Sequence, residues 1–227
     1  MKQKIKEKPI TLDSEMVKAI LDGQKTQVRS IMNPQPVPYK VHLPMELGEF
    51  SKLMKNYTKN GYDLLHTQGL LEGMMTGLPD YAYPETMLYV RESWQHTKYL
   101  NLPPTDENYR YVYAADGQDW KEIDDWKWNP AATMPKDAIR LWLKVTDVHP
   151  AKLHDIDEAG VLAEGITIQK DATNPDAKPQ YKRYGSTNVW LTSPKDSFKS
   201  YWIYKYGGQS WALNPYVWVT TFERLKK

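Results

Sequence analysis

Apolar residues recur at helical spacing close to the start of the chain. They occupy the one-sided positions of a short amphipathic helix: Met16, Val17, Ile20 and Leu21. Asp13 is a good N-cap, and Glu15 falls in the first turn, where the helix dipole favours an anion. Gly23 suits the left-handed position that ends many helices. The pattern predicts a helix that begins after Asp13 and ends before Gly23.

The next segment, 25–30, is expected to be a strand whose two faces differ in chemistry. One face would carry Lys25, Gln27 and Arg29. The other would carry Thr26, Val28 and Ser30. A basic row just past a helix C-terminus is suited to an anion or a carboxylate. The alternative is a solvated strand edge that its charges keep soluble.

Further along the chain, alternation and apolar runs predict four more strands. They cover residues 87–94, 109–115, 139–148 and 216–223. Segment 216–223 is apolar on both faces, which is typical of a central strand. The pair His149-Pro150 is expected to end segment 139–148, because proline lacks a backbone donor.

Helical spacing predicts helices at 46–57 and 198–206. A short helix is expected to begin after Asp155 or Asp157 and to end at Gly165. Residues 32–86 are interpreted as an insertion packed on the main fold. The polar segment 168–195 is interpreted as a long mobile loop or hairpin.

Two carboxylates occupy positions that disfavour a free anion. Glu92 shares its strand face with apolar residues, so it must pair, bond or protonate if it is buried. The alternative is that the strand end is already exposed at this point. Glu164 falls in the last turn of the short helix, where the dipole disfavours an anion. Lys25 and Arg29 are candidate partners for Glu164, unless it simply faces water.

Composition narrows the classes of function. The length of 227 residues permits one large domain, or one domain with insertions. A formal net charge of +2 argues against a protein that coats nucleic acid by bulk charge, although a local basic groove stays open. The absence of cysteine excludes disulfides and cysteine zinc sites, and favours a cytoplasmic location. The five histidines show no metal-ligand spacing, so neither a metal nor another cofactor is expected.

The termini and the aromatic content add two expectations. Lysine-rich residues 1–8 are not followed by an apolar signal core, and no apolar run reaches membrane-spanning length. We therefore expect neither secretion nor a membrane partner. Tyrosine and tryptophan (16 and 9 residues) far outnumber phenylalanine (3 residues). Such rings suit base stacking, and equally the walls of a small β-barrel.

Residues 23–30 read G-Q-K-T-Q-V-R-S, which resembles the ASCH family motif G-x-K-T-x-T-x-R. Segments 88–94, 128–135, 145–148, 163–166 and 214–219 are similar to the longer ASCH proteins of phages and prophages. The resemblance implies an α+β, PUA-like fold: a small mixed β-barrel with flanking helices and an inserted helical segment. It implies a single domain over 1–227, with insertions at about 32–86 and 168–195, and the host cytoplasm as the location if the chain is phage-encoded.

Small bacterial members of that family hydrolyse the acyl amide of N4-acetylcytidine. The resemblance implies a lysine, a threonine nucleophile three residues later, and a glutamate. Lys25 and Glu164 match the first and last of these, whereas Val28 stands at the nucleophile position without a hydroxyl. The motif arginine falls on Ser30 rather than on Arg29. Thr26 and Ser30 are candidate replacements for the missing hydroxyl.

The candidate ligand-binding residues lie on the family-like segments. They are Arg29, Gln27, Glu92, Arg91, Trp94 and Met134. In the similar phage proteins the loop that holds Met134 sits beside the pocket.

The sequence is therefore consistent with three functions. The first is an RNA- or modified-nucleoside-binding module, in which a base stacks on an aromatic ring and the cations meet a phosphate. The second is an amidohydrolase acting on an N4-acylated cytidine-like nucleoside, with Lys25 as general base and Glu164 as proton shuttle. Its nucleophile would be a displaced hydroxyl or a water activated by the lysine. The third is a ribonuclease, an activity assigned to other ASCH proteins. The sequence leaves the ligand and the oligomeric state open.

Overall fold

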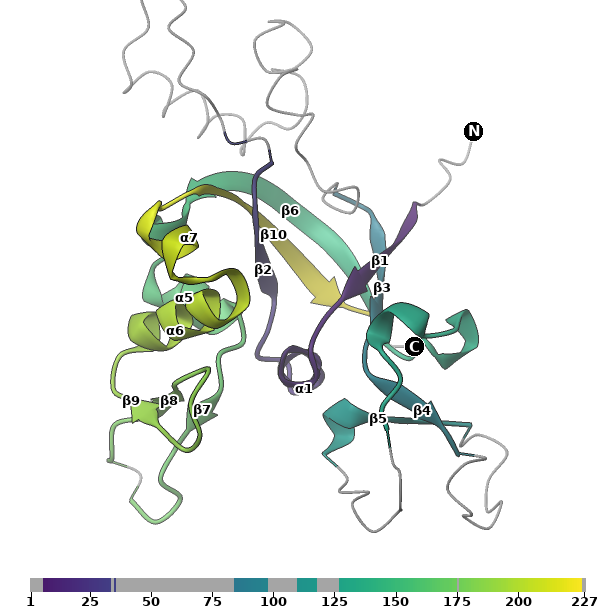
Figure 1. The fold of residues 1–227 in the computed structure, drawn as a ribbon, viewed down its shortest axis with the longest axis horizontal. Helices are drawn as coiled ribbons and strands as arrows, with labels where there is room; N and C mark the ends of the chain where they lie inside the picture. Colours follow the sequence, from purple (N-terminus) through teal and green to yellow (C-terminus); the bar gives the residue numbers. More distant parts are fainter. Residues whose placement is uncertain are drawn as a thin grey trace, which may run out of the picture.

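A computed structural model describes residues 6–33, 35, 84–97, 110–117, 127–174 and 176–225. The helix expected at 46–57, and most of the insertion expected at 32–86, lie outside these residues. The described chain is a mixed α+β fold built on one five-stranded sheet (Figure 1).

The sheet has the strand order β1-β3-β6-β10-β2. Its strands are β1 (Glu7–Thr11), β2 (Gln27–Ile31), β3 (Met87–Arg91), β6 (Trp142–Lys152) and β10 (Tyr216–Arg224). β1 and β3 run parallel, and the other neighbours are antiparallel. The edge strands β1 and β2 do not pair with each other, so the described strands form an open sheet. Helix α1 lies between these two edges (Figure 1).

Strand β10 confirms the prediction of a central strand. It is paired on both sides, with β6 and with β2. Val217, Val219 and Phe222 are at most 3% exposed, because helices and loops cover the sheet. The apolar residues on both faces of segment 216–223 therefore reflect burial on both faces.

Helix α1 (Ser14–Leu21) forms as the pattern predicts. The side chain of Asp13 accepts a hydrogen bond from the backbone N–H of Met16 at 2.9 Å, which satisfies one free donor of the first turn. Met16 and Ile20 face the core and are 1% exposed. Gly23 has φ 75° and ends the helix.

Strand β6 differs from its prediction, because it continues through Pro150 to Lys152. Strand β3 pairs with β6 only at residues 142–144. Beyond that point β10 is the only described strand beside β6, so Pro150 lies on a sheet edge, where a missing backbone donor is tolerated. As a consequence Asp147 and His149 are strand residues rather than the end of one.

The predicted strand 87–94 is also wrong in its length. Strand β3 ends at Arg91, and the chain then enters a second sheet, in which β4 (Trp94–His96) pairs with β5 (Tyr111–Tyr113). The expected strand at 109–115 is thus reduced to three residues. Segment 168–195 contains a small three-stranded sheet of β7 (Ile168–Gln169), β8 (Gln180–Lys182) and β9 (Trp190–Leu191).

Three helices lie beside the sheet on the side of β2 and β10 (Figure 1). They are α5 (Glu158–Ala163), α6 (Pro194–Tyr206) and α7 (Gly208–Ala212). Asp157, not Asp155, caps α5, and Gly165 follows it with φ 77°. Helix α6 begins four residues before the predicted 198, because Ser193 caps it and Pro194 fits its first turn.

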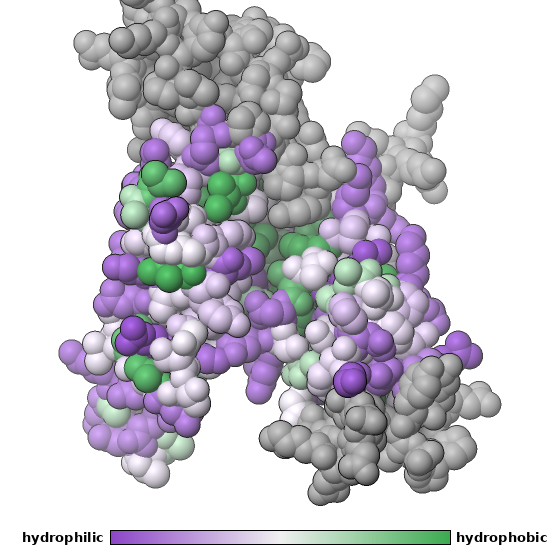
Figure 2. All heavy atoms as spheres, in the orientation of Figure 1, coloured by the Kyte–Doolittle hydropathy of each residue, from purple (hydrophilic) through white to green (hydrophobic). Residues whose placement is uncertain are grey.

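The face in Figure 2 is mainly hydrophilic over α6 and β7–β9, with hydrophobic residues interspersed. Among the described residues, the exposed large apolar side chains are Leu162, Val189, Ile203, Tyr204 and Leu213. No helix within the described ranges is long and apolar enough to cross a membrane.

Candidate functional site

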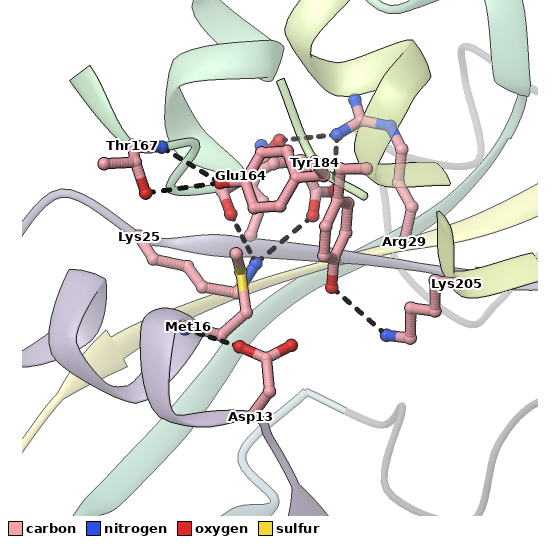
Figure 3. Close-up of polar contacts among 10 residues, drawn as sticks. Asp13, Met16, Lys25, Arg29, Glu164, Thr167, Tyr184 and Lys205 are labelled. Atoms are coloured by element: carbon pink, nitrogen blue, oxygen red, sulfur yellow. Dashed lines mark hydrogen bonds and ion pairs between the residues drawn. The ribbon is translucent and has the colours of Figure 1, made fainter. Parts of the chain in front are cut away.

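Lys25, Arg29 and Glu164 meet in one buried ion cluster (Figure 3). Lys25 Nζ lies 3.2 Å from Glu164 Oε2 and donates to the Glu164 backbone carbonyl at 2.7 Å. Arg29 Nη1 donates to Glu164 Oε1 at 2.8 Å. The side chain of Glu164 is 3% exposed. The structure therefore gives Glu164 the cationic partners that its helix-end position requires.

The local chain path explains how the cluster assembles. Glu164 is the C-cap residue of α5, where the dipole disfavours an anion, and two cations offset that cost. The backbone N–H of Thr26 donates to Ala163 O at 2.9 Å, which ties the start of β2 to the end of α5. Gly165 packs against Lys25 so closely that an added Cβ would lie 2.6 Å from Lys25 Cβ.

Burial decides the electrostatics of Lys25. Desolvation lowers the pKa of Lys25 below its ordinary 10.5, and the nearby Glu164 carboxylate opposes that shift. Because the side chain of Lys25 is 1% exposed, its ammonium depends on Glu164 rather than on water.

A hollow of about 460 Å³ opens next to this cluster. One wall is the sheet, and the other is α5 with the segment that precedes it. The lining residues are Gln27, Arg29, His149, Ala151, Asp155, Ile156, Asp157, Ala159, Gly160 and Ala163. Arg29 thus belongs both to the ion cluster and to the hollow, whereas Lys25 and Glu164 lie behind it and do not line the hollow.

The guanidinium of Arg29 has a fixed orientation and an unused donor. Its Nη1 contacts Glu164 and, at 3.5 Å, Gln27 Oε1. Arg29 is 8% exposed, and its Nε has no hydrogen-bond partner among the described residues. A buried donor without a partner costs free energy, so each such group in a native structure needs an explanation. The Nε atom is itself buried, so the part of Arg29 that lines the hollow is the rest of its guanidinium.

His149 lines the same sheet wall of the hollow as Arg29 and is paired with Asp147. His149 Nδ1 and Asp147 Oδ2 are 2.6 Å apart. A carboxylate only accepts, so the Nδ1 of His149 carries the hydrogen, and whenever the ring is neutral its Nε2 is an acceptor. This pair was not predicted from the sequence, although its i, i+2 spacing on a strand was a usable signal. The expected strand end at His149-Pro150 concealed it.

The remaining predicted ligand residues gather in a second cluster. Glu92 is 0% exposed and receives a two-pronged ion pair from Arg140, with Nε–Oε1 2.9 Å and Nη2–Oε2 3.0 Å. Burial is the main reason that the pKa of Glu92 is raised, and Arg140 counteracts it. Its backbone N–H donates to Met134 Sδ at 3.4 Å. Glu92 therefore satisfies the expectation that a carboxylate on a core-facing row must find a partner.

Arg91 and Trp94 belong to the same region as Glu92. Arg91 Nη1 donates to the carbonyl of Ala132 at 3.3 Å, and Trp94 packs on the ring of Tyr111. Within the described ranges no hydrogen bond or ion pair joins Arg91, Glu92 or Trp94 to Lys25 or Glu164. Glu92, predicted from the sequence as a candidate ligand-binding residue, forms its side-chain hydrogen bonds with Arg140 in this second cluster.

The candidate hydroxyls differ from each other in burial. Thr26 is exposed, whereas Lys25 beside it is buried. Val28 is 8% exposed and belongs to the hydrophobic core. The Ser30 hydroxyl is buried and has no partner among the described residues. Strand alternation puts Val28 and Ser30 on the face of β2 opposite Gln27 and Arg29.

Within the described part of the chain, no group of three or more histidine and acidic residues could hold a metal ion.

A scan of protein-family models, a search of curated proteins and a search of solved structures each find no match to this chain.

Proposed function

We propose that this chain binds a nucleoside unit, either a base of RNA or a free modified nucleoside, in the hollow beside Arg29. One observation carries the proposal: a guanidinium held in place by Glu164 and Gln27 lines a cavity, with its Nη2 beside Gly160 of the cavity wall. Arginine is well suited to the carbonyl and ring-nitrogen acceptors of a base edge.

The size and lining of the hollow support a ligand of this class. Its volume of about 460 Å³ falls within the usual range of small-molecule sites. Apolar walls from Ala151, Ile156 and Ala163 stand beside a few polar groups. A flat heterocycle with hydrogen-bonding edges matches such a mixture, because its faces are apolar and its rim is polar.

We further propose that the chain is a divergent ASCH protein with a PUA-like fold, acting in the cytoplasm. The motif-like segment 23–30 places Lys25 against Glu164, the two residues for which the family resemblance implies a shared site. The α+β class agrees with this relationship, and the described open sheet is compatible with a divergent version of the fold.

The test is titration calorimetry with a panel of nucleosides and short single-stranded RNAs. The wild type is compared with Arg29→Lys, which keeps a charge beside Glu164 but loses the guanidinium donors. We expect at least about tenfold weaker binding, the effect of losing one hydrogen bond to a charged group. Arg91→Lys is the matched control in the second cluster and should bind like the wild type. If Arg29→Lys bound these ligands as tightly as the wild type, the hollow beside Arg29 would not be the binding site.

A second candidate is the amidohydrolase, which one observation favours. Lys25 is a buried lysine with a lowered pKa beside a carboxylate, the environment in which lysine serves as a general base. It ranks second because Lys25 is 3% exposed and does not line the hollow. Incubation of the wild type and Lys25→Met with N4-acetylcytidine, followed by chromatography of released cytidine, tests it. Turnover that requires Lys25 would place this function first.

A further inference from the structure

Two rows of residues cross the three strands β2, β10 and β6 beneath the hollow. Val219 on β10 pairs with Arg29 on one side and with His149 on the other. Thr221, two residues later, pairs in the same way with Gln27 and Asp147. Directly paired residues, and residues two apart in a strand, point to the same face of a sheet. Arg29 and His149 therefore rise from the same face, one on each side of Val219.

The same rows explain how both side chains are oriented. Gln27 accepts from Arg29 Nη1 and donates through Nε2 to Thr221 Oγ1 at 3.2 Å. Asp147 holds the ring of His149. In each strand, the residue two positions earlier fixes the residue that lines the hollow. Such support from neighbouring side chains is what a precise recognition site requires.

The spacing of strands sets the distance between the two groups. Neighbouring strands lie roughly 4.8 Å apart, so the backbones at Arg29 and His149 are about 10 Å apart across Val219. Arg29 contributes only donors, whereas His149 in its neutral form offers its free Nε2 as an acceptor. A ligand that spans the hollow must accept at one end and donate at the other.

The charges around the hollow disfavour an anion. Glu164 already pairs with Arg29, and the other ionisable residues on the described wall are His149, Asp155 and Asp157. A phosphate group placed among them would face two carboxylates, whereas an uncharged heterocycle with an amino group would not be repelled. Carboxylates on the rim also suit exocyclic amines as acceptors.

We propose that the hollow recognises an uncharged heterocycle bearing an exocyclic amino group, whose acceptor edge meets Arg29 and whose amino group donates to His149 Nε2. This inference rests on the proposed nucleoside binding and names the chemical pattern that the site reads. His149 is a specificity-determining residue in this arrangement, and Asp147 is the residue that positions it.

The experiment combines one substitution in the protein with one change in the ligand and measures the affinity of all four combinations. Adenosine, cytidine and guanosine are each compared with the analogue dimethylated at the exocyclic nitrogen, using titration calorimetry. In the wild type, dimethylation should weaken binding about tenfold, the effect of one lost hydrogen bond. In His149→Phe, which keeps a ring without polar atoms, the same dimethylation should change affinity less than about twofold, since no bond remains to be lost. Any penalty for the added methyl groups is common to both proteins.

Two further measurements show which part of the proposal is wrong if the expected result is not obtained. His96→Phe, on β4 and outside the hollow, should keep the wild-type loss on dimethylation. Inorganic phosphate should not displace a bound nucleoside, and displacement would overturn the exclusion of anions. Equal losses in the wild type and His149→Phe would overturn the role of His149 alone. Binding of short RNA without any amino nucleoside would overturn this inference but not the proposed function, and absence of all binding would overturn both.

Discussion

Arg29 and His149 are separated by one residue of the sheet, Val219, with which both are paired. They come from strands that are far apart in the sequence, and only the antiparallel register of β10 with β2 and β6 places them opposite each other. Because they rise from rigid strands rather than loops, a ligand in the hollow meets groups that are already oriented.

The contact between Gly165 and Lys25 provides a stringent test of the buried cluster. Gly165→Ala would place a Cβ 2.6 Å from Lys25 Cβ and 2.9 Å from Ala19 Cβ, at φ 77°. We expect a loss of unfolding free energy of about 1–2 kcal/mol from the left-handed backbone, plus about 1–3 kcal/mol from overpacking. Urea unfolding measures the total.

The control for that substitution is Gly23→Ala. Gly23 has a similar φ of 75°, but nothing lies within 4 Å of its added Cβ. Only the backbone cost of about 1–2 kcal/mol is expected there. If both variants lost the same stability, the close approach of Gly165 to Lys25 would not exist.

Much of the Lys25 cluster followed from the sequence because local rules determine it. The cap at Asp13, the stop at Gly23 and the alternation after it placed Arg29 and Gln27 on one face. The dipole argument then identified Lys25 and Arg29 as partners for Glu164. Each step depends on neighbours within a few residues, for which propensity and periodicity are informative.

The rest depended on long-range pairing that one sequence does not reveal. Pro150 was expected to end a strand, but it is tolerated because β6 has no described neighbour on that side. Arg140 was not identified as the partner of Glu92, since 48 residues separate them and nothing local connects them. The passage from β3 to a second sheet at Glu92 likewise reflects pairing with β5.

Lys25 should leave a signature in the pH dependence of stability. Its folded pKa is lowered below 10.5, so between these two values the unfolded chain holds a proton that the folded chain lacks. Stability therefore rises with pH across that window. Lys25→Met removes the titrating group, so this variant lacks the gain in stability at high pH. The unfolding free energies of the wild type and the variant are measured at about pH 7 and about pH 10. The deficit of the variant relative to the wild type should be larger at about pH 10. A constant difference would show that the pKa of Lys25 is not lowered.

The pair of Glu92 and Arg140 should be structural. Arg140→Met leaves a carboxylate that is 0% exposed without its ionic partner, which should cost about 3–5 kcal/mol of unfolding free energy. Adding Glu92→Gln in the same chain removes the charge and should recover much of that loss. Denaturant unfolding of the two single variants and the double variant completes the cycle.

The raised pKa of Glu92 also predicts the direction in which the stability of the protein changes with pH. The folded carboxyl holds its proton to higher pH than the unfolded one, so stability is lost as pH rises through the folded pKa. Removal of Arg140 should steepen this loss, because the ion pair no longer opposes burial. If the Arg140→Met variant lost no more stability than the wild type from about pH 5 to about pH 7, burial would not raise the pKa of Glu92.

Gly160→Ala should perturb the hollow more than the fold. The added Cβ would lie 3.0 Å from Arg29 Nη2 and from Asp157 Oδ1, so the guanidinium must shift. We expect several-fold weaker nucleoside binding in calorimetry, with an unfolding free energy within about 1 kcal/mol of the wild type. Gly208→Ala, whose Cβ would meet nothing within 4 Å, is the control and should leave binding unchanged.

Val28→Thr should be accepted by the core without creating an active hydrolase. Val28 pairs directly with Thr220, whose hydroxyl is buried and has no partner among the described residues. Side chains of directly paired residues are close enough for a Thr–Thr hydrogen bond. The hydroxyl introduced at position 28 can therefore form a hydrogen bond with the buried hydroxyl of Thr220. We expect an unfolding free energy within about 1 kcal/mol of the wild type, whereas Val28→Ala, which adds no hydroxyl and removes volume, should be less stable. Chromatography should detect no cytidine released from N4-acetylcytidine by Val28→Thr beyond the wild-type amount, because this residue faces away from Arg29 and the hollow. A clear gain in turnover would show that the threonine reaches Lys25 and Glu164 after all.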